Sequence, residues 1–248
     1  MEKRLIIAFL LASFFMPSHA QGDDFAVWTE ANVEKKINSR WSVEGGAELR
    51  TRDNSKEIDR WSVGAEASYK FTDWLKFSAG YMLIDDHRYK LNDKGTKYAD
   101  FWGLRHRVNV SLTASQSFGD LSVSLRERWQ YTYRPEMTVA RYWLDTNERK
   151  DRYEDEYADD HTYSGKGKSV WRNRLMLKYK LTRTFRPYAN VESSVASGIE
   201  KMRYGVGTEI RLNKHHSLDA KYIYQRYYDD DADEANCHIL GVGYTYKF

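Results

Sequence analysis

The chain has 248 residues, a formal net charge of +3 and a single cysteine, which excludes a scaffold held together by internal disulfides. Its mean hydropathy is −0.77, and no segment after residue 20 is apolar enough for a membrane-spanning helix. Yet 15% of the residues are aromatic, with 19 Tyr and 8 Trp. Transmembrane β-barrels have this composition because only alternate residues face lipid, while Tyr and Trp form belts at the two membrane surfaces.

The first 20 residues have the pattern of a secretory signal peptide. Lys3 and Arg4 precede the apolar run Leu5–Met16, which is too short to span a membrane as a helix, and small residues lead to Ala20. We expect cleavage after Ala20 and no lipid anchor, because no cysteine follows that position. The mature chain, residues 21–248, is then one domain, an outer-membrane β-barrel.

Apolar and polar residues alternate with a period of two through most of the mature chain, which predicts β-strands. The alternation is weakest in the first of these segments and in the one that begins at Pro187. The expected strands are Phe25–Lys35, Trp41–Arg50, Arg60–Phe71, Leu75–Leu83, Leu104–Leu112, Leu121–Tyr133, Trp171–Leu181, Pro187–Val195, Met202–Leu212, Leu218–Tyr224 and Cys237–Phe248.

The connections between these strands alternate in length, as in an outer-membrane barrel with short periplasmic turns and long extracellular loops. The fold class is therefore all-β, a single antiparallel transmembrane barrel of 10–12 strands. Short turns are expected near 38–39, 72–73, 118–120, 182–184 and 213–215, and long loops at 53–59, 85–100, 135–168 and 229–236. The loop at 135–168 is long enough to contain its own hairpin, at Thr138–Leu144.

The strand number is the open question at this point. Eleven segments alternate, but bacterial single-chain barrels have even strand numbers. With strict alternation and a periplasmic C-terminus, eleven strands would place the N-terminus outside the cell. Because Phe25–Lys35 alternates least, ten strands are slightly favoured, and twelve remain open.

The C-terminal segment 237–248 places Leu240, Tyr244 and Phe248 on one face and small or polar residues on the other. It resembles the terminal strand through which the insertion machinery of Gram-negative bacteria recognises outer-membrane barrels.

Four short blocks near the N-terminus carry a resemblance to a known family: 25–28 (Phe-Ala-Val-Trp), 34–36 (Glu-Lys-Lys), 40–42 (Arg-Trp-Ser) and 48–50 (Glu-Leu-Arg). They resemble the start of a family of small outer-membrane barrels known as domain of unknown function 2490. The resemblance extends over nearly all of the mature chain. It implies the fold and the outer membrane of a Gram-negative bacterium, and it implies no activity.

With the apolar face toward lipid, the inward face of the predicted strands is rich in arginine. The expected inward set is Arg50, Arg52, Arg60, Arg105, Arg107, Arg126, Arg128, Arg134, Arg172, Arg174, Arg203 and Arg211, against fewer acids, Glu44, Glu48, Glu66, Glu192, Glu209 and Asp219. Guanidinium groups bind carboxylates and phosphates through paired hydrogen bonds. The candidate ligand-binding residues are Arg105, Arg107, Arg126, Arg128, Arg172 and Arg174.

Two registers follow if the turns are tight. A turn at Ser115–Asp120 would place Arg107 opposite Arg128, a destabilising pair unless a negative group lies between them. A turn at 182–184 would place Arg174 opposite Glu192. The second arrangement supports an alternative in which Arg–Glu networks simply fill the interior, as side chains do in small barrels.

Enzymatic and metal-binding signals are weak. Asp85–His87 and Asp159–His161 each place acids beside a histidine at the expected rim, as in omptin proteases, but neighbouring residues of these types also arise by chance. The acidic run 229–234 lacks the spacing of a Ca²⁺-binding loop, and the basic residues alternate along strands rather than forming a nucleic-acid patch. We expect no enzyme activity, no cofactor, no metal and no role for Cys237.

Three functions are compatible with the sequence. The first is a passive pore or binding barrel for small anionic solutes. The second is a structural barrel with a filled interior, whose loop at 135–168 binds a partner. The third, a hydrolase at the rim, has least support. The expected partners are outer-membrane lipid and lipopolysaccharide, the insertion machinery through 237–248, and a small anionic solute.

Overall fold

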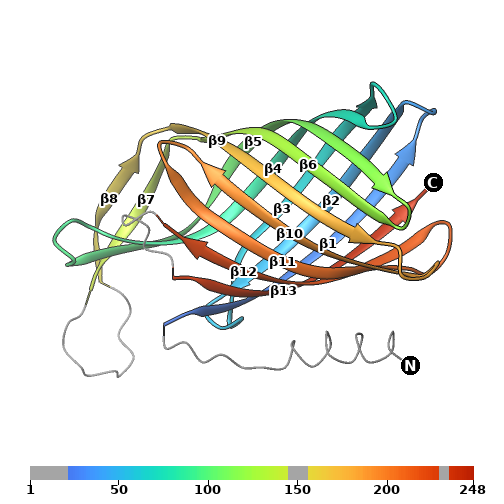
Figure 1. Cartoon of the computed structure of the whole chain (residues 1–248). Coiled ribbons are helices and arrows are strands. Elements are labelled where there is room, and N and C mark those ends of the chain that lie inside the picture. Colours follow the sequence, from blue (N-terminus) through green and yellow to red (C-terminus); the bar gives the residue numbers. More distant parts are fainter. Residues whose placement is uncertain (1–21, 145–155, 229–234) are drawn as a thin grey trace.

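The computed structural model describes residues 22–144, 156–228 and 235–248, and within them the chain forms one sheet, antiparallel except where its first and last strands meet, that closes into a barrel (Figure 1). Eleven strands make the wall, and two more form a hairpin beside it. The strands are β1 (Asp24–Lys36), β2 (Trp41–Arg52), β3 (Glu57–Lys70), β4 (Leu75–Leu91), β5 (Lys97–Phe118), β6 (Leu121–Arg134), β7 (Met137–Trp143), β8 (Tyr157–Tyr163), β9 (Lys166–Tyr179), β10 (Phe185–Val195), β11 (Ile199–Arg211), β12 (His216–Tyr227) and β13 (Cys237–Lys247).

The period-two pattern sorts side chains between the outside of the wall and the interior, which we call the lumen. On β3, the outward Trp61 is 38% exposed, whereas the neighbouring inward Ser62 is 2% exposed. The same alternation continues through Val63 to Tyr69. The sequence prediction of an all-β barrel is therefore confirmed, and on β3 the two faces are those that the alternation predicted. Arg52, expected to point inward, instead contacts His87 at 2.9 Å, because the β2–β3 register shifts after Arg50.

The barrel closes through β1 and β13, which run parallel, with Asp24 opposite Cys237 and Glu34 opposite Lys247. The slight preference for ten strands was wrong. Although Phe25–Lys35 alternates weakly, it is a full wall strand, because the parallel partner β13 satisfies its backbone on one side and β2 on the other. Eleven wall strands place Asp24 and Lys247 at opposite ends of the barrel.

The two ends differ in their connections. At one end of the barrel, which we call the turn end, the strands join through brief turns such as 119–120 and 212–215. We call the opposite end of the barrel the loop end. Two connections predicted to be long are shorter than expected, since only 53–56 and 92–96 lie between the paired strands there. A hairpin does lie within 135–168, but the predicted segment Thr138–Leu144 is only its first strand, β7, which pairs with β8. β7 also pairs with β5, through Trp143 opposite Lys97 and Tyr142 opposite Tyr98.

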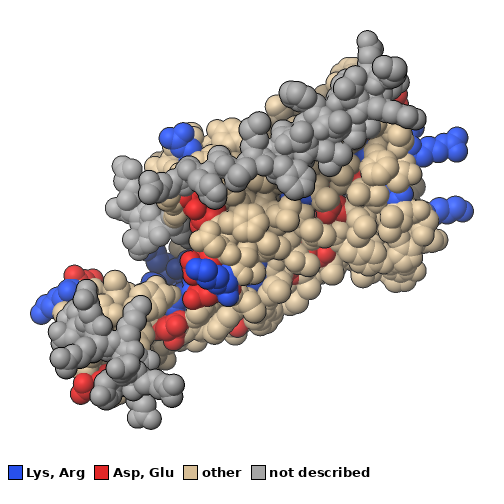
Figure 2. Space-filling model, turned by 90° about the horizontal axis from the view of Figure 1, so that it is seen from below, with Lys and Arg blue, Asp and Glu red and all other residues tan. Residues whose placement is uncertain are grey.

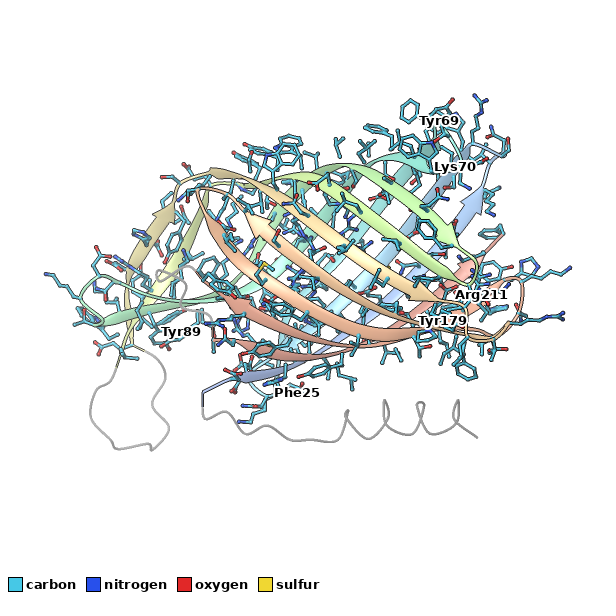
Figure 3. The ribbon with its side chains drawn as sticks, in the orientation of Figure 1. Phe25, Tyr69, Lys70, Tyr89, Tyr179 and Arg211 are labelled. Carbon is cyan, nitrogen blue, oxygen red and sulfur yellow. The ribbon has the colours of Figure 1, made fainter. Side chains whose placement is uncertain are left out.

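The outer surface has the pattern of a barrel that faces lipid. Exposed tryptophans lie near the turn end, at Trp41 and Trp74, and nearer the loop end, at Trp102 and Trp171. Figure 3 shows Tyr69 and Tyr179 toward the turn end and Phe25 and Tyr89 toward the other. Figure 2 shows mostly uncharged residues along the barrel, with Lys and Arg projecting at one end. No helix in the described residues has the length and hydropathy needed to cross a membrane.

Glycines on the inward face leave room for large side chains that lie against the wall. Tyr188 lies directly opposite Gly207 on the neighbouring strand, and its hydroxyl donates a hydrogen bond of 2.8 Å to Asp219 on the strand beyond. A Cβ at position 207 would lie 2.7 Å from the Tyr188 ring. The absence of a side chain therefore lets one tyrosine bridge three strands.

Candidate functional site in the lumen

The lumen contains a cavity of about 620 Å³, which is the candidate functional site. Its lining includes eleven Lys and Arg residues and seven Asp and Glu residues. The basic residues are Arg50, Arg60, Arg107, Arg126, Arg128, Arg172, Arg174, Lys178, Arg203, Lys221 and Lys247, and the acidic ones are Glu30, Glu44, Glu48, Glu66, Glu192, Glu209 and Asp219. The lining therefore has an excess of positive charge in a chain that is close to neutral.

Five of the six candidate arginines line this cavity, and one does not. On β6 and β9, Arg126 lies directly opposite Arg174, and Arg128 lies opposite Arg172. Arg107 lines the same cavity from β5. Arg105 is instead held by Asp86 nearer the loop end, outside the cavity lining.

Glu192 is the main counter-ion of the arginine-rich side of the lumen. Its side chain is 6% exposed and contacts three guanidinium groups from three strands. Arg126 lies 2.7 Å away, Nε of Arg172 lies 3.2 Å away, and Arg203 lies 3.4 Å away. The predicted register of Arg174 opposite Glu192 is confirmed, although the ion pairs themselves are formed by the other three arginines.

Two further carboxylates hold arginines in pairs. Glu48 accepts hydrogen bonds from Arg50 at 2.6 Å and Arg60 at 3.3 Å. Asp86, which is 5% exposed, accepts two hydrogen bonds of 2.9 Å from Arg88 and also pairs with Arg105. These networks fill part of the interior, as the alternative function predicted. The basic excess means that they do not neutralise all of it.

The predicted pairing of Arg107 with Arg128 is wrong. The β5–β6 ladder continues to Phe118 opposite Leu121, so the turn consists of residues 119–120 alone and Gly119 adopts a φ of 62°. Arg107 therefore lies opposite Thr132 and donates to its hydroxyl at 3.1 Å. Arg128 lies opposite Ser111 and reaches Glu66 at 2.8 Å.

Sequence reasoning missed Trp28, which is 8% exposed and lies in the lumen. The guanidinium carbon of Arg50 lies 3.4 Å from the centre of its ring, and that of Arg203 lies 5.1 Å away. Trp28 packs in a small apolar cluster with Ala26, Ile239 and Cys237. A signal was available, because Trp28 has the inward phase of its strand, between Ala26 and Glu30, where other strands carry polar residues.

The two acid–histidine motifs do not assemble as hydrolytic pairs. Asp86 is buried and bound to arginines, whereas His87 is stacked on Trp102 on the other face of β4 and contacts Asp100. Asp159 lies on the hairpin outside the barrel, where it is bound by Arg141 and Lys97.

In that hairpin, Arg141 donates two hydrogen bonds to Asp159, at 2.8 and 2.7 Å, and Lys97 donates one at 3.0 Å. These bonds lower the pKa of Asp159 to about 2. Within the described ranges, no group of three or more His, Cys, Asp or Glu residues could hold a metal ion. The signal-peptide prediction and the acidic run 229–234 lie outside those ranges.

Solved structures with the same architecture are outer-membrane barrels. The β domain of the Bordetella autotransporter BrkA aligns with a TM-score of 0.50 and 14% identity, over 84% of this chain and 82% of that chain. The translocator domain of autotransporter NalP from Neisseria meningitidis aligns with a TM-score of 0.47 and 14% identity, over 82% of this chain and 74% of that chain. The NanC porin aligns with a TM-score of 0.46 and 12% identity, over 91% of this chain and 99% of that chain. At 14% identity the likeness to the BrkA β domain shows the fold alone, and the two lower scores support no further conclusion.

The comparison with curated proteins finds no matching sequence. The family model described as "Protein of unknown function (DUF2490)" matches residues 25–236, which is most of the barrel and extends from its first strand almost to its last. The resemblance carried by the four N-terminal blocks is thereby confirmed, and this chain belongs to the DUF2490 family of outer-membrane-type β-barrels.

Proposed function

We propose that this protein resides in the outer membrane of a Gram-negative bacterium, with its turn end in the periplasm, and that it binds or passes small anionic solutes through its lumen. The observation that carries the proposal is the basic excess of the cavity lining. Positively lined, water-filled cavities concentrate anions because the low-dielectric wall focuses the field into them.

The arrangement of the arginines supports this function over simple filling. Arg126 opposite Arg174 and Arg128 opposite Arg172 are like-charge pairs, which destabilise a sheet unless anions offset them. Glu192 and Glu66 offset part of this charge. Arg107 and Arg174 have no carboxylate within 4.0 Å among the described residues, so an anion could bind to either.

The test is ion selectivity in planar bilayers under a KCl gradient. Wild-type protein should conduct with a preference for chloride, and Arg107→Gln with Arg174→Gln should shift the reversal potential toward cation preference. The control Arg183→Gln removes one positive charge at an exposed turn outside the cavity and should leave the reversal potential unchanged. Absence of conductance, together with absence of anion binding, would leave the filled barrel as the better description.

A second candidate function, surface interaction, is favoured by the β7–β8 hairpin. It stands beyond the wall and exposes Trp143 at 46% and Tyr157 at 56%. Aromatic side chains of this kind are enriched in protein–protein contacts. Removal of residues 137–163 should abolish such binding while the barrel still shows heat-modifiable migration on gels.

A further inference from the structure

Inside the barrel, glutamates gather on β1–β3 and arginines gather on the facing strands β6 and β9, although β2 and β3 also carry Arg50 and Arg60, which are paired with Glu48. In the closed strand order, β2 and β9 are five steps apart in one direction and six in the other, so their inward side chains face each other across the lumen. We define the acidic wall as the inward glutamates of β1–β3 and the basic wall as the inward arginines of β6 and β9. The acidic wall contains Glu30, Glu34, Glu44, Glu48 and Glu66, and the basic wall contains Arg126, Arg128, Arg172 and Arg174.

Within each wall, like charges lie directly opposite each other on neighbouring strands. Glu44 is in register with Glu34 on one side and with Glu66 on the other. Arg126 and Arg174 repeat this arrangement with the opposite sign. Each such pair destabilises the sheet, and a lumen that served only to stabilise the fold would intersperse its charges. The separation instead creates an electric field across the lumen.

Most charges of the cavity lining are compensated, and the exceptions lie on both sides of the lumen. Three lining residues have no opposite charge within 4.0 Å among the described residues: Glu44, Arg107 and Arg174. Lys247 lies in register with Glu34, which is itself in register with Glu44, and Lys247 is paired with Glu34 at 3.0 Å. Glu192, opposite Arg174, is bound to three other arginines. The lumen therefore offers one free carboxylate and two free guanidiniums around the same cavity.

We propose that the lumen binds small zwitterionic solutes, which carry a carboxylate and an ammonium group. The carboxylate lies toward Arg174 on the basic wall, and the ammonium lies toward Glu44 on the acidic wall. A purely anionic solute would satisfy the guanidiniums and leave Glu44 unpaired beside further negative charge. The cavity of about 620 Å³ is of the size that holds small ligands. This inference rests on the proposed function, because it requires that solutes enter the lumen.

The test compares two probes that differ by one amino group, L-glutamate and glutarate. Each is titrated against the chloride current of the full-length mature protein in planar bilayers, and its binding in detergent is measured by calorimetry. For wild-type protein, glutamate should act at a concentration roughly fivefold lower than glutarate, the effect of one solvent-exposed ion pair. Glu44→Gln should abolish this preference, and Arg174→Gln should weaken the binding of both probes.

Glu136→Gln is the matched control, because Glu136 is an exposed glutamate outside the cavity and should leave the preference intact. Heat-modifiable migration on gels verifies that each variant is folded. The inference is overturned if glutarate acts as well as glutamate on the wild type, or if folded Glu44→Gln keeps the preference; the proposed function survives either result. If neither probe acts on the current or binds, the inference is overturned, whereas the proposed function falls only if the anion-selective current is absent as well.

Discussion

The guanidinium carbon of Arg50 lies 3.4 Å from the centre of the Trp28 ring, inside the lumen and on directly opposite positions of β2 and β1. A guanidinium at this distance is attracted by the negative face of the ring. Arg203 approaches the same ring at 5.1 Å from β11, on the other side of β1. One aromatic side chain thus contacts two lumen arginines and occupies space in the lumen.

Replacing Trp28 with alanine should widen the passage and weaken the barrel. We expect a larger single-channel conductance in planar bilayers and a loss of about 3 kcal/mol in the free energy of unfolding, as for other buried aromatic side chains. Trp74→Ala is the control, because Trp74 is 53% exposed at a turn and should change neither quantity much. An unchanged conductance in folded Trp28→Ala would show that the narrowest point lies elsewhere.

Replacing Glu192 with glutamine should destabilise the barrel through charge rather than shape. Glutamine has almost the same volume, but Arg126, Arg172 and Arg203 would lose their shared carboxylate. Removing one partner of a buried ion pair costs about 3 kcal/mol or more. Urea titration of refolded protein in micelles measures the change, with Glu136→Gln as the exposed control. A loss below about 1 kcal/mol would mean that the three arginines do not depend on this residue.

The β7–β8 hairpin should lose its anchoring only in strong acid. The pKa of Asp159 is about 2 in the folded hairpin, below the ordinary value of 3.8. A lowered pKa means that the bonds to Arg141 and Lys97 stabilise the hairpin above pH 3.8 and are lost as the pH falls through about 2. NMR shifts of the β7 and β8 amides between about pH 6 and pH 2 would follow this transition.

In the Asp159→Asn variant, the β7 and β8 amides should already have at neutral pH the NMR shifts that the wild type has in acid. Asp160→Asn, one residue further along β8, should keep the wild-type behaviour, because Asp160 forms no ion pair within 4.0 Å in the described residues. A midpoint near pH 4 in the wild type would contradict the ion-pair assignment.

Alanine at Gly207 should destabilise the wall. Its Cβ would lie 2.7 Å from the Tyr188 ring and 2.8 Å from the backbone oxygen of Ala220, and the backbone cannot move aside. We expect a loss of roughly 1–3 kcal/mol, the range for overpacking. Gly198→Ala is matched to it, since nothing lies within 4 Å of a Cβ there. Equal urea midpoints for the two variants would argue against tight packing of Tyr188.

The sequence was sufficient to predict which face most strand residues occupy, because a period of two is a local property of the chain, although Trp28 in the lumen was missed. It was insufficient to predict cross-strand pairs, because an error of a few residues in the position of a turn changes which residues lie opposite each other. Ser117 and Ser122 look like turn residues, yet their hydroxyls hydrogen-bond at 2.8 Å across the ladder and extend it. That extension moved Arg107 opposite Thr132.

The candidate site was predictable in composition but not in pairing. Five of six candidate arginines line the cavity, since alternation alone determines which side chains point inward. The three-arginine contact of Glu192 joins β6, β9 and β11 to β10, and β6 is not a neighbour of β10 in the sheet. Long side chains reach past adjacent strands, so strand register does not determine such contacts.

The same-direction seam between the first and last strands has a topological consequence. Asp24 and Lys247 therefore lie at opposite ends of the barrel, whereas an even-numbered antiparallel closure would place both at the same end. Duplicating hairpins adds strands two at a time and cannot produce eleven. This barrel and any even-numbered barrel therefore differ by an odd number of strands.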